Sequence, residues 1–137
     1  MTNEHLGRLN SMAGKSMQST LGIRVTGVDG NCILGEMAVD ERTTQPFGVL
    51  HGGASAAFAE TLASYGANMQ VDFPKEHCVG VELNCSYLHS VRTGETVYGR
   101  AKPIKIGKRL QVWQVDITNA ESRVVTRARV TLMKVTR

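Results

Sequence analysis

Hydrophobic and polar residues alternate along most of the chain, which is the pattern of strands with one buried face. The alternation predicts six strands, over residues 21–27, 32–39, 78–88, 96–105, 110–118 and 123–135. Asp29-Gly30-Asn31 is a strong hairpin signal between the first two strands, and residues 119–122 form a turn before the last one. We therefore expect a run of hairpins in an antiparallel sheet.

Three of these strands carry more detailed expectations. In the strand over 78–88, one face is expected to contain Val79, Val81, Leu83 and Cys85. Pro103 breaks the strand over 96–105, because proline has no N–H to donate to a sheet. In the strand over 110–118, the alternation slips once near Trp113.

One segment, residues 54–70, has the length and composition of a helix. Its sequence, ASAAFAETLASYGANMQ, is rich in alanine, has no proline and carries mostly small side chains all the way round. A surface helix shows one polar face, so we expect this helix to be covered on several sides, as by a sheet wrapped around it. Residues 1–20 predict a short amphipathic helix through Leu6, Leu9 and Met12.

The order of these elements is strand, strand, helix and then a run of strands, which predicts an α+β fold with an antiparallel sheet. It argues against the alternation of a Rossmann-type fold. The length predicts a single domain over residues 1–137, with residues 1–20 as an N-terminal extension.

The composition changes this picture little, because 42% hydrophobic and 20% charged residues are ordinary for a globular protein. Sixteen Lys and Arg against 12 Asp and Glu give a net charge of +4, which favours anionic partners. Only residues 102–109 form a basic cluster, and it suits a phosphorylated small ligand as well as nucleic acid. The few aromatic residues form no aromatic and basic platform, so we expect no nucleic-acid partner.

Three cysteines, Cys32, Cys78 and Cys85, are an odd number without a C-x-x-C pair. This predicts reduced, buried thiols in a cytoplasmic protein. No apolar run reaches the roughly 18 residues that a membrane helix needs, so we expect no membrane partner. The histidines show no metal-ligand spacing, and no P-loop, G-x-G-x-x-G or G-x-S-x-G motif is present, so we expect no metal and no cofactor.

The stretch QPFGVLHGGASAAFAETLAS, residues 45–64, combines features that suit chemistry at a carbonyl group. His51-Gly52-Gly53 precedes the helix, where the first N–H groups lack internal acceptors and the helix dipole is positive. Glycines leave these donors unobstructed, so that they can stabilise an oxyanion. The alternative is a plain tight turn into the helix.

Glu60 is the one charged residue between Ala54 and Val71. A carboxylate among small apolar groups loses solvation, which suits a general base or acid; the alternatives are a helix face turned to water and a structural ion pair. Ser64 lies one turn further on the same face, where it either positions a water or bonds to its own helix. Gln45 either donates to a carbonyl or is solvated, and His51 either shapes the loop by donating to the backbone or is catalytic.

Through this stretch, and on through VGVELNCSYLHSV and IKIGKRLQVW, the sequence resembles the hotdog-fold acyl-CoA thioesterases of the PaaI-like and 4-hydroxybenzoyl-CoA thioesterase type. Within this family it looks closest to the thioesterases of enterobactin proofreading and of 1,4-dihydroxy-2-naphthoyl-CoA hydrolysis. The resemblance implies a hotdog fold, in which a curved antiparallel sheet wraps around one long helix. It also implies a homodimer, extending to a homotetramer, with active sites at the dimer interface.

The resemblance implies a role for each residue that matches the family motif. Glu60 matches the catalytic carboxylate, as nucleophile or as general base on water, and Ser64 matches a hydroxyl residue that places the water. The Gly52 N–H matches the oxyanion donor, Gln45 a contact to the reacting carbonyl, and His51 the histidine that shapes the site. In the family, the residues that match Glu60 and Ser64 come from one subunit. Those that match Gly52, Gln45 and His51 come from its partner.

The resemblance also places the coenzyme A moiety of the substrate. The matching positions are Gly80, Tyr87, Leu88, His89, Ser90, Lys105, Ile106, Gly107, Lys108, Arg109 and Leu110. Lys105, Lys108 and Arg109 suit the nucleotide phosphates. The chain departs from its relatives at residues 87–89, where they carry a histidine pair and an arginine, and it has an extra residue before Pro103.

The expected function is hydrolysis of an acyl- or aryl-CoA thioester, or of an acyl-carrier-protein thioester. A non-catalytic acyl-CoA-binding module and a hotdog hydroxyacyl-thioester dehydratase are the alternatives. The joint presence of Gln45, His51, Glu60 and Ser64 favours hydrolysis, because a pure binder needs no carboxylate beside the carbonyl.

Overall fold

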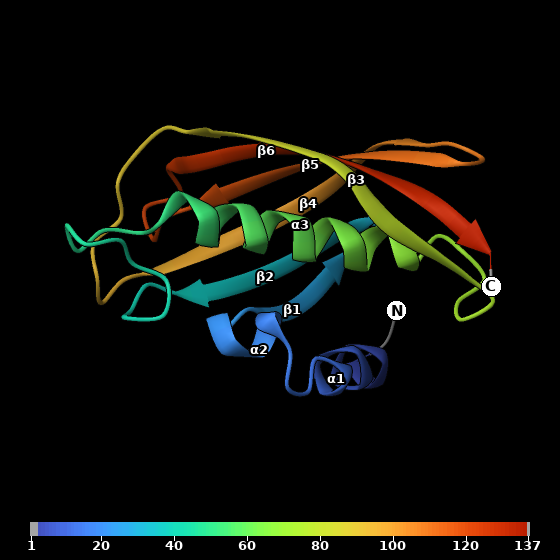
Figure 1. Cartoon of the computed structure of the whole chain (residues 1–137), viewed down its shortest axis with the longest axis horizontal. Coiled ribbons are helices and arrows are strands. Elements are labelled where there is room, and N and C mark those ends of the chain that lie inside the picture. Colours follow the sequence, from blue (N-terminus) through green and yellow to red (C-terminus); the bar gives the residue numbers. More distant parts are fainter. Residues whose placement is uncertain (1–2, 137) are drawn as a thin grey trace.

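A curved antiparallel sheet covers one long helix in the structure, a computed structural model that describes residues 3–136 apart from the side chains of residues 3, 5 and 9 (Figure 1). Residues 1, 2 and 137 of the expected domain lie outside the described residues. The elements in chain order are α1 (Asn3–Met12), α2 (Met17–Leu21), β1 (Arg24–Asp29), β2 (Cys32–Ala38), α3 (Gly52–Asn68), β3 (Glu76–Tyr87), β4 (Thr96–Ile106), β5 (Leu110–Thr118) and β6 (Val124–Thr136). This architecture confirms the predicted α+β fold.

The sheet has the strand order β1-β2-β4-β5-β6-β3, and all neighbours are antiparallel. β1 and β2 form the predicted hairpin, in which Asp29 pairs with Cys32. β3 follows α3 and crosses to the opposite edge of the sheet, where it pairs only with β6. Among the described strands, β1 and β3 therefore each keep one open edge.

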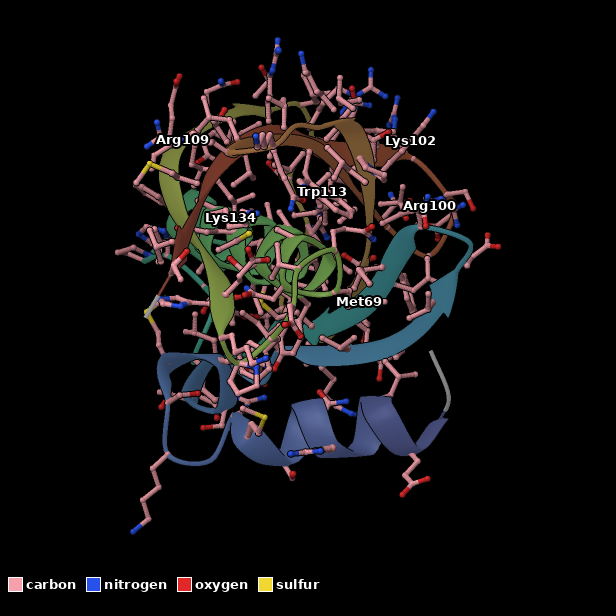
Figure 2. All side chains as sticks on the ribbon, turned by 90° about the vertical axis from the view of Figure 1, so that its right-hand side faces the viewer. Met69, Arg100, Lys102, Arg109, Trp113 and Lys134 are labelled. Carbon is pink, nitrogen blue, oxygen red and sulfur yellow. The ribbon has the colours of Figure 1, made fainter. Side chains whose placement is uncertain are left out.

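The buried stripe of α3 consists of residue pairs one helical turn apart, which is the spacing of a helix with one face on a core. Its members are Ala54, Ser55, Phe58, Ala59, Leu62, Ala63, Gly66 and Ala67. Trp113 of β5 is fully buried against this stripe, and a Cβ on Gly66 would come within 2.5 Å of its ring (Figure 2). Small residues thus let the helix lie close to the sheet.

The sheet covers α3 on one side, whereas the sequence led us to expect cover on several sides. Looking along α3, Figure 2 shows the strands arching over the helix. On the opposite side of the helix, Glu60 is exposed, and Ala56, Ala57 and Ser64 are only half-buried. The small side chains of this second face therefore have no sheet to pack on in the single chain.

The N-terminal region differs from the prediction of one helix followed by a strand from residue 21. It forms two helices, and Leu21 is the last residue of α2. Gly22 then caps α2 in the left-handed conformation, with φ of 72°, so β1 begins only at Arg24. Within the described residues, no helix has the length and hydrophobicity to cross a bilayer.

A β-bulge in β3 changes which residues face the core. The register with β6 shifts between Gly80 and Glu82, so Leu83 and Cys85 are half-buried while Val79 and Val81 are exposed. The prediction that all four share one face is therefore wrong, because the extra residue of the bulge reverses the alternation.

Two other local predictions also differ from the structure. The alternation in β5 does not slip: Trp113 keeps its face, and the buried residue before it on that face is the polar Gln111, while Leu110 is exposed. Pro103 lies inside β4 and does not end it. It occupies a bulge toward β5, beyond Ala101, where the pairing with β2 stops, so its missing N–H costs no bond to β2.

Candidate active site

Thr43 fixes the loop that leads into α3. This side chain is buried at 2% exposure; its Oγ1 donates to the Ala38 carbonyl at 2.9 Å and accepts from the Asp40 N–H at 3.1 Å. Its carbonyl accepts from the His51 N–H at 2.8 Å. An isolated bridge between Thr44 and Leu50 closes the loop, so its two ends lie side by side at the start of the helix.

His51 is the N-cap of α3, and its ring shapes the backbone there. The residue is extended, with φ of −72° and ψ of 130°, and Nδ1 accepts from the Gly53 N–H at 2.8 Å. The ring therefore accepts a hydrogen bond from the backbone, where we had expected it to donate one. Because Nδ1 is the acceptor, it carries no proton in this arrangement, and Nε2 is the ring nitrogen left to donate.

The Gly52 N–H is the donor that this cap leaves free. Ala54 and Ser55 donate to the His51 carbonyl, and Gly53 is taken by the His51 ring. Among residues 3–136, no acceptor is recorded for the Gly52 N–H. A free donor at the positive end of a 17-residue helix is suited to hold a developing negative charge.

A cavity of about 350 Å³ lies next to this donor. It is lined by Gln45 and Gly52 together with residues 87–90 at the end of β3. The Gln45 Oε1 accepts from the Phe47 N–H, which leaves its amide NH₂ to donate. The fold thus brings together six of the residues singled out from the sequence, although they are separated by more than thirty positions in the chain.

The ring of Tyr87 lies on Gly52. A Cβ on Gly52 would approach the ring carbons to between 3.0 and 3.3 Å, which explains why glycine suits this position. Partial burial raises the pKa of Tyr87, and the charge of the neighbouring Cys85 and a hydrogen bond to it act in the same direction. The phenol therefore stays protonated at neutral pH and covers one side of the free donor.

Glu60 lies elsewhere on α3, and its surroundings differ from the expected ones. Its side chain is exposed in the single chain, so the shielding that we expected is absent there. The physical reason is that the sheet covers only the other side of α3. Its Oε1 reaches across to β3, where it touches Gly80 so closely that a Cβ on that glycine would overlap it. Ser64, one turn further along α3, is half-buried.

The distance along α3 separates Glu60 from the free donor. Glu60 follows Gly52 by eight positions, which corresponds to about 12 Å at the rise of an α-helix. A single thioester carbonyl cannot contact both groups of the same chain. The sequence-predicted residues therefore form two sets, one around Gly52 and one around Glu60 with Ser64 and Gly80.

The basic residues of the cluster over 102–109 lie in β4 and in the turn that joins β4 to β5. The turn between β4 and β5 is closed by a bond from the Gly107 N–H to the Leu110 carbonyl at 2.8 Å. The hairpin lies at the end of the sheet beyond the C-terminus of α3, opposite the loop that leads into the helix (Figure 1). Lys105, Lys108 and Arg109 are exposed, and none of them forms an ion pair within the described part of the chain.

Some residues at the first set were not predicted from the sequence. Val49, Ser55 and Thr126 also line the cavity beside Gly52. Ser55 follows Gly52 by three residues, which places both on one helix face, so its helical spacing was a usable signal. Thr126 comes from β6, and no local pattern connects it with the loop.

Among the side chains that the structure describes, no three His, Cys, Asp or Glu residues are arranged to hold a metal ion.

Known proteins resemble this chain over most of its length. Residues 47–126 match a family described as the thioesterase superfamily. The chain is 37% identical over 126 residues to the 1,4-dihydroxy-2-naphthoyl-CoA hydrolase of Escherichia coli (strain K12), covering 92% of this chain and 91% of that protein. It is 39% identical over 119 residues to the proofreading thioesterase EntH of Klebsiella pneumoniae, covering 86% of this chain and 85% of that protein.

Solved structures agree with these sequence matches. A thioesterase from Haemophilus influenzae superposes with a TM-score of 0.91 at 40% sequence identity, covering 96% of this chain and 90% of that one. The similarity thus includes the loop before α3, the helix and the whole sheet.

Proposed function

This chain belongs to the thioesterase superfamily and is a thioester hydrolase, and we propose that its substrates are acyl- or aryl-CoA thioesters, with Glu60 as the catalytic carboxylate. Thioesters of an acyl-carrier protein are the alternative substrates. The observation that carries the proposal is the unpaired Gly52 N–H at the start of α3, beside a cavity that also contains Gln45.

The Gly52 end supplies the electrophilic half of the site. The substrate carbonyl oxygen accepts from the Gly52 N–H, and Gln45 donates to it from the preceding loop. The hydrogen bonds from both donors become stronger as negative charge develops on this oxygen, which lowers the barrier to attack. His51 holds the loop in shape, because its ring accepts a hydrogen bond from the Gly53 N–H.

Glu60 supplies the other half. Either its carboxylate attacks the carbonyl carbon directly, or it removes a proton from a water that attacks there and that Ser64 positions. In both routes the C–S bond breaks, the thiolate sulfur takes up a proton, and one water is consumed in forming the carboxylic acid and free coenzyme A. An exposed carboxylate becomes effective once a second chain shields it from bulk water.

We propose that the two halves of one site come from two copies of the chain. The separation of about 12 Å along α3 supports this, because one chain cannot place Gly52 and Glu60 on the same carbonyl. β3 offers an open edge next to Glu60, and the uncovered face of α3 carries small residues that a second copy can pack on. A homodimer joined at β3 supports two such sites, and pairing of dimers gives the expected homotetramer.

The exposed cations of the β4–β5 turn suit the phosphates of coenzyme A. The turn with Lys105, Lys108 and Arg109 lies beyond the C-terminus of α3, and the cavity at residues 87–90 lies beside its N-terminus (Figure 1). In a two-chain site, both groups of residues therefore border the same substrate. The three cysteines are unpaired, which supports the cytoplasm as the compartment.

A thiol-release assay tests the proposal. Wild-type protein is screened against benzoyl-CoA, hexanoyl-CoA, decanoyl-CoA and one acyl-carrier-protein ester, and Glu60→Ala is run beside it. We expect kcat of Glu60→Ala to fall about 10²- to 10⁴-fold while the ester still binds. Unchanged thiol release by this variant would rule out Glu60, and binding without release by the wild type would instead indicate an acyl-CoA-binding module.

A matched pair at residue 52 tests the oxyanion donor. Gly52→Pro removes the N–H, and the extended backbone of His51 tolerates a following proline. Gly52→Ala adds the same Cβ contact with Tyr87 and keeps the N–H. We expect kcat of Gly52→Pro to fall about 10²- to 10³-fold below that of Gly52→Ala; equal rates for the two would exclude this donor.

A further inference from the structure

The sheet has two edge strands, and an asparagine side chain is hydrogen-bonded to the backbone of each. In β1, the Asn10 Nδ2 donates to the Val25 carbonyl at 2.7 Å, and the Asn10 Oδ1 accepts from the Val25 N–H at 3.2 Å. In β3, Asn68 bonds to Cys78 in the same way, at 3.4 Å from the carbonyl and 2.8 Å from the N–H. A side-chain amide thus takes the place of one residue of a neighbouring strand at both edges.

The two amides close different shares of their strands. Val25 is the second of six residues in β1, and beyond the bulge that follows it only residues 27–29 remain. Cys78 is the third of twelve residues in β3, and beyond the bulge of that strand residues 82–87 keep an unbroken register with β6. β3 therefore keeps enough open backbone to pair with another strand, whereas β1 keeps too little.

The helix α1 carries Asn10 to the edge of β1. Both views show α1 lying beside β1 at the border of the sheet (Figures 1 and 2). Among the α1 side chains that the structure describes, Leu6 and Asn10 alone are not exposed, and they lie one helical turn apart on the face toward the sheet. The helix is therefore attached through one narrow stripe, in which Asn10 makes directional contacts to the strand.

An open edge at β1 would affect how the protein assembles. In the homodimer proposed above, the two chains join at β3, so β1 forms each outer end of the combined sheet. Free edges at both ends would let dimers pair end to end through β1 without limit, which is the hazard of an exposed edge strand. In such a contact, the outward N–H and C=O groups of Val25 would bond to a second β1 strand in place of Asn10.

We propose that α1 is an edge clasp. Its Asn10 amide closes β1 to the β1 strand of a second copy, and it thereby confines self-association through the sheet to β3. The inference rests on the homodimer in the proposed function, and it adds a second contact surface, the β1 edge, that the clasp keeps out of use.

Asn10→Ala tests the clasp, with Ser11→Ala as the matched control. Ser11 is the next residue of α1, and its hydroxyl donates within the helix to the Arg8 carbonyl. We expect the Val25 amide to exchange with deuterium about tenfold faster or more in Asn10→Ala, measured by NMR, and at the wild-type rate in Ser11→Ala. In sedimentation velocity runs, Asn10→Ala should form species larger than the wild type, in a share that grows with concentration.

A second substitution shows which surface the larger species use. Thr26 is exposed next to Val25, and a lysine there would set like charges against each other in a β1–β1 pair. Asn10→Ala combined with Thr26→Lys should therefore return to the wild-type size, with circular dichroism and the melting temperature as checks on folding. Continued growth of the double variant would overturn the inference, because unfolding rather than edge pairing would then explain the larger species.

Two further results would also overturn the clasp: wild-type size of Asn10→Ala at every concentration, and unchanged exchange of the Val25 amide. The same runs separate this inference from the proposed function. A monomeric wild type would contradict the proposed dimer at β3, and the growth of Asn10→Ala would still decide the clasp. A dimeric wild type with an Asn10→Ala variant of the same size would contradict the clasp alone.

Discussion

The carboxylate of Glu60 lies against the backbone of Gly80, across the gap between α3 and the edge strand β3. A Cβ at residue 80 would overlap the Glu60 Oε1, so a side chain there requires the carboxylate to move. Gly80 also stands at the start of the β3 bulge. The bulge and the glycine together set the position of the carboxylate that we propose to be catalytic.

Gly80→Ala should therefore displace Glu60 and lower kcat about 10- to 100-fold, because small errors in the position of a reacting group are costly. Gly27→Ala in β1 is the matched control, since its Cβ would meet only an ordinary contact at 3.7 Å. The measurement is thiol release with benzoyl-CoA, and wild-type kcat in Gly80→Ala would show that Glu60 needs no such placement.

The β4–β5 turn should affect substrate binding more than the chemical step. With Lys108→Ala or Arg109→Ala, KM for CoA esters should rise about three- to tenfold at low salt, because each removes one unpaired cation. The control is the matching N-acetylcysteamine thioester, which lacks the nucleotide and should keep its KM. An unchanged KM for CoA esters would place the phosphates elsewhere or favour carrier-protein substrates.

A buried polar network beneath α3 should matter for stability. Gln111 is 2% exposed; its Nε2 donates to the Ala67 carbonyl at 3.2 Å and its Oε1 accepts from the Trp113 Nε1 at 2.9 Å. Gln111→Leu leaves the buried Trp113 Nε1–H without an acceptor, while the Ala67 carbonyl keeps the Gln70 N–H, so the free energy of unfolding should fall by about 1–3 kcal/mol in urea titrations. Gln114→Leu on the outer side of the same strand should change it by only about 0.5 kcal/mol. Equal losses for the two variants would contradict this view.

The general course of the fold follows from local sequence patterns. The helix predicted over 54–70 is observed as α3 over Gly52–Asn68, since His51-Gly52-Gly53 supplies an N-cap as well as a turn. Predictions from local patterns were wrong where contacts with residues distant in the sequence determine which side chains are buried. The bulge at Gly80 exposes Val79 and Val81, and Gln111 is buried because α3 offers it a carbonyl. Neither the bulge nor that carbonyl is visible in the alternation of a single strand.

Local sequence patterns likewise predict only part of the candidate active site. The motif over 45–64 located the helix start to within two residues, and the free Gly52 donor follows from how helices begin. No local pattern predicted that Tyr87 would lie on Gly52, because β3 reaches that point only by crossing to the far edge of the sheet. It also suggested a shielded Glu60, whereas one chain leaves this residue in solvent.

The Cys78 thiol should react slowly at neutral pH. Burial raises its pKa, outweighing the opposite effect of nearby Lys134, so the reactive thiolate fraction is small at pH 7 and grows as the pH rises. Peptide mapping after iodoacetamide treatment should find Cys78 labelled less than Cys32 at pH 7 and labelled more strongly at pH 9. Uniform labelling after denaturation is the control, and preferential labelling of Cys78 at pH 7 would contradict the prediction.

Subunit complementation tests most directly whether Glu60 of one chain acts with Gly52 of another. Glu60→Ala and Gly52→Pro chains with different affinity tags are co-expressed, and the mixed dimer is purified through both tags. One of its two sites then combines an intact Glu60 with an intact Gly52, so about half of the wild-type thiol-release rate per dimer should return, while each parent variant stays near background. A mixed dimer as inactive as its parents would contradict a site shared between two chains.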